Sequence, residues 1–290
     1  MDFIALAMGL AFSLMWSSAF ATARIIVHDA SPFTVLALRF LIAGVIAIGI
    51  AWAQGHRLRM TRQVALIVVI FGICQNALYL GLNFVAMQWV EGSLAAVIAS
   101  SMPLMVALIG WLAAGERMRP LGVAGLVAGF FGVALIMESR ITHGASAYGV
   151  ALCLVGALAL AVATRLVRGV SSENSLLMIV GLQMLVGAVV LGALAPFVEH
   201  PRIDATPALV AALGYQIFVP GIIATVIWFA LVNRVGAVRA ATFHFLNPFF
   251  GLLVAAALLG EPITVVDLIG VGIAMAGILA VQLSRAGVRV

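Results

Sequence analysis

The feature that most constrains this chain is an apolar stretch, residues 240–261, which is long enough to cross a bilayer yet carries a proline near its middle. Pro248 has no backbone N–H, so a helix through this stretch lacks the hydrogen bond to the carbonyl of His244. In hydrocarbon, a freed carbonyl is tolerated only where it faces protein or a water-filled cavity. We therefore predict a broken membrane helix that lines an internal cavity.

The same pattern occurs 145 residues earlier, in residues 95–116, and this offset is half the length of the 290-residue chain. The matching positions are the proline and the Gly-Glu pair that ends the stretch: Pro103 with Pro248, Gly115 with Gly260, and Glu116 with Glu261. These matches fall in register without a gap. They predict two repeats, residues 1–140 and residues 145–290, whose proline-broken spans enclose one shared cavity.

Composition places the chain in a membrane before any motif is considered. Hydrophobic residues make up 65% of the sequence and charged residues 9%, whereas a soluble domain has about half and about a quarter. We predict an all-α membrane protein of ten transmembrane helices. The expected spans are residues 3–23, 33–53, 64–86, 92–113, 121–138, 147–167, 175–197, 208–232, 238–259 and 266–283.

Five spans in each half is an odd number, so the two repeats must have opposite orientation in the membrane. This inverted-repeat plan is typical of secondary transporters, which bind substrate near the midplane between the repeats. Arginine counts set the direction, because cytoplasmic loops carry an excess of positive charge. With cytoplasmic N- and C-termini, the inner side holds Arg57, Arg59, Arg62, Arg117, Arg119, Arg165, Arg168, Arg234, Arg239, Arg285 and Arg289, and the outer side holds Arg24, Arg39, Arg140 and Arg202.

Polar residues inside the spans are candidates for the cavity wall, because such groups are costly when they face lipid. The candidate substrate-binding residues are Trp16, Ser17, Gln75, Asn76, Tyr79, Asn83, Ser100, Gln183, Trp228, His244 and Asn247, and the candidate helix breaks are Pro103, Pro220 and Pro248. The third span is the clearest case, because its four polar residues lie on one helical side over about two turns. Pro220 should also free the carbonyl of Gln216.

Each candidate has a plainer interpretation. Gln183 and Gln216 can hydrogen-bond a neighbouring helix, and Trp16 and Trp228 can be packing residues. His244 can be a satisfied interior histidine. Arg24 and Arg39 are expected near the outer surface, paired with Asp29 or with carbonyls, although either could hold a substrate carboxylate.

Several chemistries are disfavoured by what the sequence lacks. It contains no lysine, so neither a P-loop nor a lysine Schiff base is possible. All its acids lie in loops or at span ends, which argues against cation antiport on a buried carboxylate and favours a facilitated carrier. Cys74 and Cys153 fall inside spans and indicate neither a disulfide nor a metal. We expect no cofactor, no metal and no nucleic-acid partner.

The sequence resembles the drug/metabolite transporter superfamily, specifically its ten-helix EamA-type members. The residues that carry the resemblance are Trp16-Ser17 with Arg24, Pro32 with Arg39, Tyr79 with Asn83 and Ala86, and the doubled Pro…Gly-Glu pattern followed by Gly270 and Gly277. Within the family it looks most like the YddG-type exporters of aromatic amino acids. The resemblance implies a multi-pass transporter of the bacterial inner membrane, not an enzyme, that works by alternating access.

A neutral, aromatic-edged site suits a zwitterion with a bulky apolar side chain, so aromatic and other bulky neutral amino acids are the expected substrates. Export of other small metabolites or drugs is the alternative within the same class. An intramembrane protease is disfavoured because no span carries an aspartate in its middle, and a channel would need an open polar path. The glycine-rich fifth and tenth spans either pack on the bundle or form a dimer seam, so we expect a monomer or a weak dimer.

Overall fold

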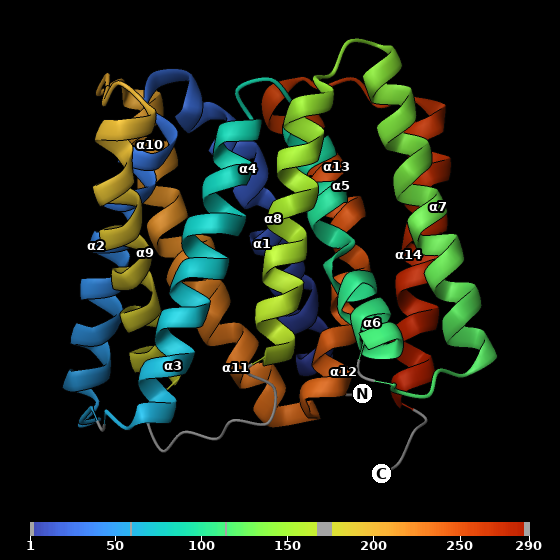
Figure 1. Cartoon of the computed structure of the whole chain (residues 1–290), viewed down its shortest axis with the longest axis horizontal. Helices are drawn as coiled ribbons and strands as arrows, with labels where there is room; N and C mark the ends of the chain where they lie inside the picture. Colours follow the sequence, from blue (N-terminus) through green and yellow to red (C-terminus); the bar gives the residue numbers. More distant parts are fainter. Residues whose placement is uncertain (1–2, 59, 114, 167–175, 287–290) are drawn as a thin grey trace.

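The computed structural model describes residues 3–58, 60–113, 115–166 and 176–286. Within these ranges, ten helical segments are long and apolar enough to cross a membrane, as predicted, and the only extended pairing is an isolated bridge between Ala30 and Ile203. The segments stand side by side, and the first and last of them have their chain ends at the same end of the bundle (Figure 1). We call this the terminal end. Of the arginines predicted on the inner side, Arg59, Arg168 and Arg289 lie outside the described residues.

The ten segments follow the predicted spans closely. In the first half they are α1 (Phe3–Asp29), α2 (Pro32–Ala53), α3–η1–α4 (Arg62–Phe71, Gly72–Leu80 and Gly81–Ala86), α5–α6 (Gly92–Ser100 and Met102–Ala113) and α7 (Pro120–Thr142). In the second half they are α8 (Ala147–Leu166), α9 (Leu176–Val198), α10–η2–α11 (Pro207–Gln216, Ile217–Ile223 and Ala224–Val235), α12–η3–α13 (Ala237–Thr242, Phe243–Leu246 and Asn247–Leu259) and α14 (Val265–Ala286).

The largest difference from the predicted bounds is in α1, which continues to Asp29 rather than ending at residue 23. The predicted span ends at Ala23, the residue before Arg24, because spans of about 20 apolar residues are expected. In the structure Arg24 donates a hydrogen bond to the backbone carbonyl of Met87, so the charged side chain has a partner and the helix continues.

Three of the membrane helices begin at a proline. Pro32, Pro120 and Pro207 each lie in the first turn of a helix, where the missing N–H has no intrahelical partner to lose. At α10 the hydroxyl of Thr206 also accepts a hydrogen bond from the N–H of Leu209, at 3.1 Å. Each of these starts lies one residue before the predicted start of its span, at residues 33, 121 and 208.

All three predicted mid-span breaks are present. The helix is interrupted at Ser101 before Pro103, it becomes a π-helix around Pro220, and it tightens into the 3₁₀ segment η3 just before Pro248. The last break is bridged by α1. Ser13 Oγ donates to the carbonyl of Phe243 at 2.9 Å, and Ser17 Oγ donates to the carbonyl of Asn247 at 3.2 Å.

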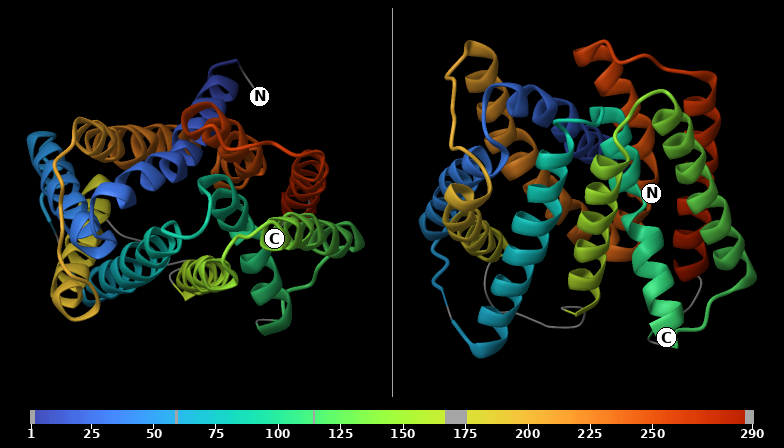
Figure 2. Two further views of the ribbon diagram at one scale, coloured as in Figure 1. Left: turned by 90° about the horizontal axis from the view of Figure 1, so that it is seen from above. Right: turned by 45° about the horizontal axis from the view of Figure 1, so that its top comes forward.

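Two long helix pairs form the sides of the bundle: α7 lies along α14, and α2 lies along α9 (Figures 1 and 2). Glycines allow the close approach. A Cβ added at Gly277 would lie 2.3 Å from the backbone nitrogen of Gly129, and one at Gly132 would lie 2.6 Å from the carbonyl oxygen of Gly270. The glycine stripes of the fifth and tenth spans therefore pack on each other within one chain, which supports the packing interpretation over the dimer seam.

Inside this frame, α1 packs against α10, α11 and α13, while α8 packs against η1, α4 and α6. The two helices hold the broken spans of both halves around the centre of the bundle. The site described below lies among α1, α2, η1, α4, α10 and η2.

Candidate functional site

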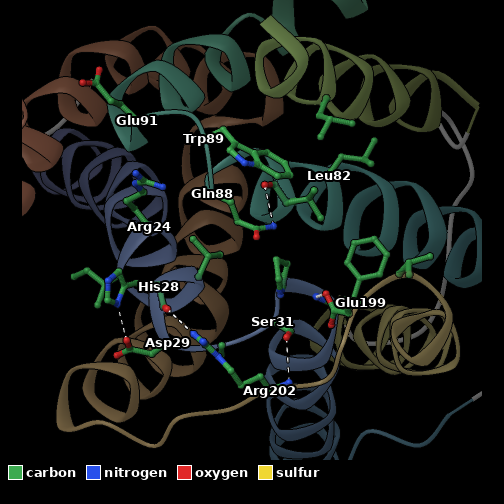
Figure 3. Close-up of a pocket in the computed structure, with 18 of the residues that line it drawn as sticks. Arg24, His28, Asp29, Ser31, Leu82, Gln88, Trp89, Glu91, Glu199 and Arg202 are labelled. Atoms are coloured by element: carbon green, nitrogen blue, oxygen red, sulfur yellow. Dashed lines mark hydrogen bonds and ion pairs between the residues drawn. The ribbon is translucent and has the colours of Figure 1, made fainter. Parts of the chain in front are cut away.

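A large vestibule opens at the end of the bundle opposite the terminal end. Its volume is about 1400 Å³, and its wall is formed by the last turns of α1, the start of α2, α4 with the following loop, α8 and the loop between α9 and α10. Figure 3 shows Arg24, Gln88, Trp89 and Glu91 on one side of this space, with Glu199 and Arg202 across from them. The entrance is thus lined by side chains of both charges.

Two of the vestibule's acids hold helix starts in place. Glu199 accepts hydrogen bonds from the N–H groups of Phe33 and Thr34, at 3.1 and 2.7 Å, and so caps α2. Glu261 caps α5 in the same way, by accepting from the first two N–H groups of that helix at 2.8 and 3.0 Å. A carboxylate at a helix N-terminus satisfies free N–H groups and complements the helix dipole. The role of these two acids in the described state is therefore structural.

Below the vestibule lies a small internal cavity of about 40 Å³. Its lining residues come from the first, second, third and eighth membrane segments: Trp16, Ala19, Phe20, Ala23, Arg39, Tyr79, Leu80, Asn83, Phe84, Met87, Gln216 and Pro220. Arg24 lines the vestibule and Met87 lines the cavity, and the hydrogen bond between them lies where the two spaces meet. The vestibule and the cavity are therefore arranged in series along α1.

Arg39 is the main correction to the predicted site. It was expected near the outer surface, but its exposed fraction is 6% and it lines the internal cavity. Nη2 donates to the carbonyl of Gln216 at 3.5 Å, the carbonyl to which Pro220 has no N–H to donate, and Nη1 has no partner. A usable signal was in the sequence, since Arg39 falls well inside a predicted span.

Two amides on the cavity wall have fixed orientations. Asn83 donates through Nδ2 to the carbonyl of Tyr79 at 2.7 Å, and Gln216 donates through Nε2 to the carbonyl of Ala19 at 2.8 Å. Because a backbone carbonyl accepts only from the NH2 group, these bonds fix the positions of the nitrogen and the oxygen in each side-chain amide. They leave Oδ1 of Asn83 and Oε1 of Gln216 buried without a partner. The residues that line the cavity therefore include one buried cation and two amides whose oxygens have no partner.

An aromatic cluster lies on the terminal side of the cavity. The ring of Phe12 is 4.7 Å from that of Trp228 and 5.4 Å from that of His244, and the last two rings are 5.1 Å apart. Trp16 joins the cluster at 5.7 Å from Phe12 and also lines the cavity. We call Phe12, Trp16, Trp228 and His244 the aromatic plug, because they fill the space between the cavity and the terminal end.

The predicted polar stripe of the third span is divided in the structure. Tyr79 and Asn83 line the cavity, whereas Asn76 donates through Nδ2 to the carbonyl of Gln183 on α9, at 2.8 Å. Gln75 is only half-buried and does not line the cavity. The reason is the π-helical segment η1, whose wider turn rotates successive side chains away from the face that a regular α-helix would give them.

The remaining predicted residues satisfy backbone groups or pack in the plug. Ser100 Oγ donates to the carbonyl of Ala96 in its own helix, at 2.6 Å. His244 and Asn247 contact each other, with Nδ1 and Nδ2 3.1 Å apart, and neither lines the cavity. The predicted site residues that the cavity brings together are thus Trp16, Tyr79, Asn83 and Pro220.

An ionic contact closes the terminal end. Glu116, after α6, lies 2.7 Å from Nη1 of Arg165 on α8 and 3.9 Å from Nη2 of Arg285 on α14. We call these three residues the terminal-end latch, because they join three helices on the far side of the aromatic plug. Among the residues that the structure describes, no group of three or more His, Cys, Asp or Glu side chains could hold a metal ion.

Comparison with known proteins agrees with this architecture. The model of the EamA-like transporter family matches the chain twice, at residues 3–138 and 147–283. The chain is 27% identical to the uncharacterized transporter YvbV of Bacillus subtilis over 89% of its own length and 84% of the relative's. It is 26% identical to the uncharacterized inner membrane transporter YedA of Escherichia coli, over 95% and 89%.

The fold also has a solved counterpart. A crystal structure with 20% sequence identity superposes with a TM-score of 0.69 over 97% of this chain and 98% of the other. Ten apolar spans, a vestibule in series with a buried cavity, and a family model that fits both halves lead to the same conclusion. The chain belongs to the EamA-like transporter family.

Proposed function

We propose that this transporter is an inner-membrane exporter of aromatic and other bulky neutral amino acids that works by alternating access. The observation that carries the proposal is the one-sided path through the bundle. A vestibule of about 1400 Å³ leads to a cavity of about 40 Å³, and the aromatic plug follows on the other side. A carrier exposes its central site to one side at a time, whereas a channel needs a continuous polar path.

The membrane topology is part of the proposal. We infer two inverted repeats, residues 1–140 and 145–290, with both termini in the cytoplasm, so that the described vestibule faces outward. The double match of the family model supports two repeats, and the arginine excess of the terminal-end loops supports the orientation. The inner membrane location is supported by the description of YedA as an inner membrane transporter.

The proposed substrate class follows from the cavity lining. Trp16 and Tyr79 offer aromatic faces to an apolar side chain, and the amides and Arg39 offer hydrogen bonds to a polar head. A volume of about 40 Å³ is far below the roughly 300 Å³ at which small-ligand pockets begin. Substrate entry therefore requires the cavity to widen.

The test is counterflow of labelled phenylalanine, tryptophan and leucine by purified protein in liposomes. We expect saturable exchange that Tyr79→Ala and His244→Ala impair, the first at the cavity and the second at the plug. Phe197→Ala is the matched control, because Phe197 is 86% exposed on the outer face of α9. Exchange should also continue without a pH gradient. If the protein exchanges other metabolites or drugs but no amino acid, it is still a carrier, but the proposed substrate class is wrong.

A further inference from the structure

The buried charge of Arg39 has no counter-charge in the described state. The exposed fraction of this residue is 6%, its contacts are a long hydrogen bond to one backbone carbonyl and the ring of Phe40 at 5.3 Å, and no carboxylate of the described residues pairs with it. An unpaired cation within a membrane span is expensive and is tolerated chiefly where it serves an ion or a substrate. The guanidinium of Arg39 could therefore be paired by an anionic group of a ligand.

Two side-chain amides of residues that line the same cavity have oxygens without a hydrogen-bond donor. Oδ1 of Asn83 and Oε1 of Gln216 have no partner, and the two residues are 1% and 0% exposed. Neither amide can turn its nitrogen inward without losing the backbone hydrogen bonds that fix it. Buried acceptors without donors are destabilising, so they point to a ligand that donates.

We propose that Arg39, Asn83 and Gln216 form the head-group site of the carrier. The guanidinium binds the carboxylate of a zwitterionic α-amino acid, and the two amide oxygens accept hydrogen bonds from its ammonium group. The side chain of the amino acid then rests on Trp16 and Tyr79, which line the same cavity. This assignment rests on the proposed transport of amino acids and names the chemistry by which their common part is recognised.

Other small ligands complete only part of this site. A simple anion neutralises Arg39 but leaves both amide oxygens without donors. An amine satisfies the amide oxygens but places a second positive charge beside Arg39, and like charges in a medium of low dielectric repel strongly. A molecule that carries both groups, as an α-amino acid does on a single carbon, offers a partner to all three side chains.

The experiment measures binding of tritiated phenylalanine to the purified full-length protein, with competition by three analogues. 3-Phenylpropionate keeps the carboxylate, phenethylamine keeps the ammonium, and phenylalaninamide keeps the ammonium with an uncharged amide. We expect each to compete more weakly than phenylalanine by about tenfold or more. Arg39→Gln should weaken phenylalanine binding by a similar factor and leave phenethylamine equal or stronger. Arg57→Gln is the matched control, because Arg57 is exposed and lines neither the vestibule nor the cavity.

The outcomes separate this assignment from the proposed function. If phenylalanine is transported but 3-phenylpropionate competes equally well, the site recognises a simple anion and the assignment is wrong. The same holds if phenylalanine binding is unchanged in a folded Arg39→Gln variant. The analogue series on the unaltered protein decides the matter even where that variant does not fold. If no amino acid is bound or transported, both the function and the head-group assignment are rejected.

Discussion

The side-chain amide of Asn76 donates a hydrogen bond to the backbone carbonyl of Gln183, 2.8 Å away, and so joins η1 to α9. The sequence predicts both residues at the substrate cavity, yet in the structure they form a contact between helices. The packing there is tight, since a Cβ added at Gly187 would lie 2.4 Å from Cβ of Asn76. Asn76 therefore stabilises the bundle, while Asn83 of the same span lines the cavity.

This division predicts different phenotypes for two asparagines of one span. Asn76→Ala leaves the carbonyl of Gln183 without its donor, so we expect a loss of about 1–3 kcal/mol in stability with little change in KM for substrate. Asn83→Ala should raise KM with a smaller effect on stability. Thermal unfolding in detergent and liposome transport measure the two quantities. If Asn76→Ala instead raises KM with little change in stability, Asn76 belongs to the substrate site.

The glycine seam between α7 and α14 gives a steric prediction. A methyl group at Gly277 would lie 2.3 Å from a backbone nitrogen of α7, where the neighbouring atoms cannot yield without moving the helix. We expect Gly277→Ala to cost about 1–3 kcal/mol, as overpacked cores do, and to lower the Tm. Gly272→Ala on the same helix is the control, because nothing lies within 4 Å of its added methyl group. Equal Tm values for the two variants would contradict the described seam.

A buried ion pair at the vestibule end allows a second matched comparison. Asp267 accepts a hydrogen bond from Nη2 of Arg140 at 2.8 Å, and the two side chains are 1% and 8% exposed. Asp267→Asn removes one of two carboxylates that pair with Arg140, and Glu91 still pairs with it, so we expect a cost of about 1.5–3 kcal/mol. Asp204→Asn breaks a pair with Arg202 whose side chains are more than half exposed, so about 0–1 kcal/mol is expected. Chemical denaturation of the two variants in detergent measures the difference.

Much of the fold is predictable because the bilayer imposes strong local rules. Span length, prolines at helix starts and the breaks at Pro103, Pro220 and Pro248 follow from backbone hydrogen bonding alone. These features appear in the structure at the expected places. Each depends on residues that are near one another in the sequence.

The site is less predictable because it depends on contacts between helices. The wider turn of η1 moves Asn76 away from the helical face of Asn83. The spacing of apolar residues in the sequence does not predict a π-helix. Arg39 is predicted near the outer surface, whereas the structure buries it at the cavity, and the lack of a partner for its Nη1 is visible only in three dimensions. His244 was correctly placed beside a helix break, but the rings of Phe12 and Trp228 make it part of the plug.

Glu91 gives a prediction about pH. Burial raises the pKa of its carboxyl group above the ordinary value of 4.5, although the nearby guanidinium of Arg140 opposes the shift. A raised pKa means that the folded state favours the protonated form. Its contribution to stability is therefore full below about pH 4.5 and is lost as the pH rises through the raised pKa.

The measurement is the Tm of the unaltered protein minus that of Glu91→Gln, followed from pH 4 to pH 8. We expect this difference to fall as the pH rises, because the glutamine variant cannot titrate at residue 91. Subtraction removes the contributions of the other titrating groups that the two proteins share. A difference that grows with pH would mean that the pair with Arg140 outweighs the effect of burial.

The terminal-end latch predicts a shift between conformations. Under alternating access, opening the terminal end requires Glu116 to separate from Arg165, a contact of 2.7 Å between α6 and α8. Glu116→Gln weakens this contact and should favour the state that is open at the terminal end, in which the vestibule is closed. A cysteine at Leu82, on the vestibule wall, reports this change through its rate of labelling by an impermeant thiol reagent.

We expect slower labelling of Leu82→Cys when Glu116→Gln is also present, with Cys74 replaced by serine and the buried Cys153 retained. The control is Glu138→Gln at the vestibule end, which should leave the rate unchanged because no residue of the latch is altered. The size of the change measures how much the latch biases the equilibrium, since each tenfold shift in population corresponds to about 1.4 kcal/mol. Unchanged or faster labelling in the Glu116→Gln protein would show that Glu116 does not hold the terminal end closed, and closure would then rest on the aromatic plug alone.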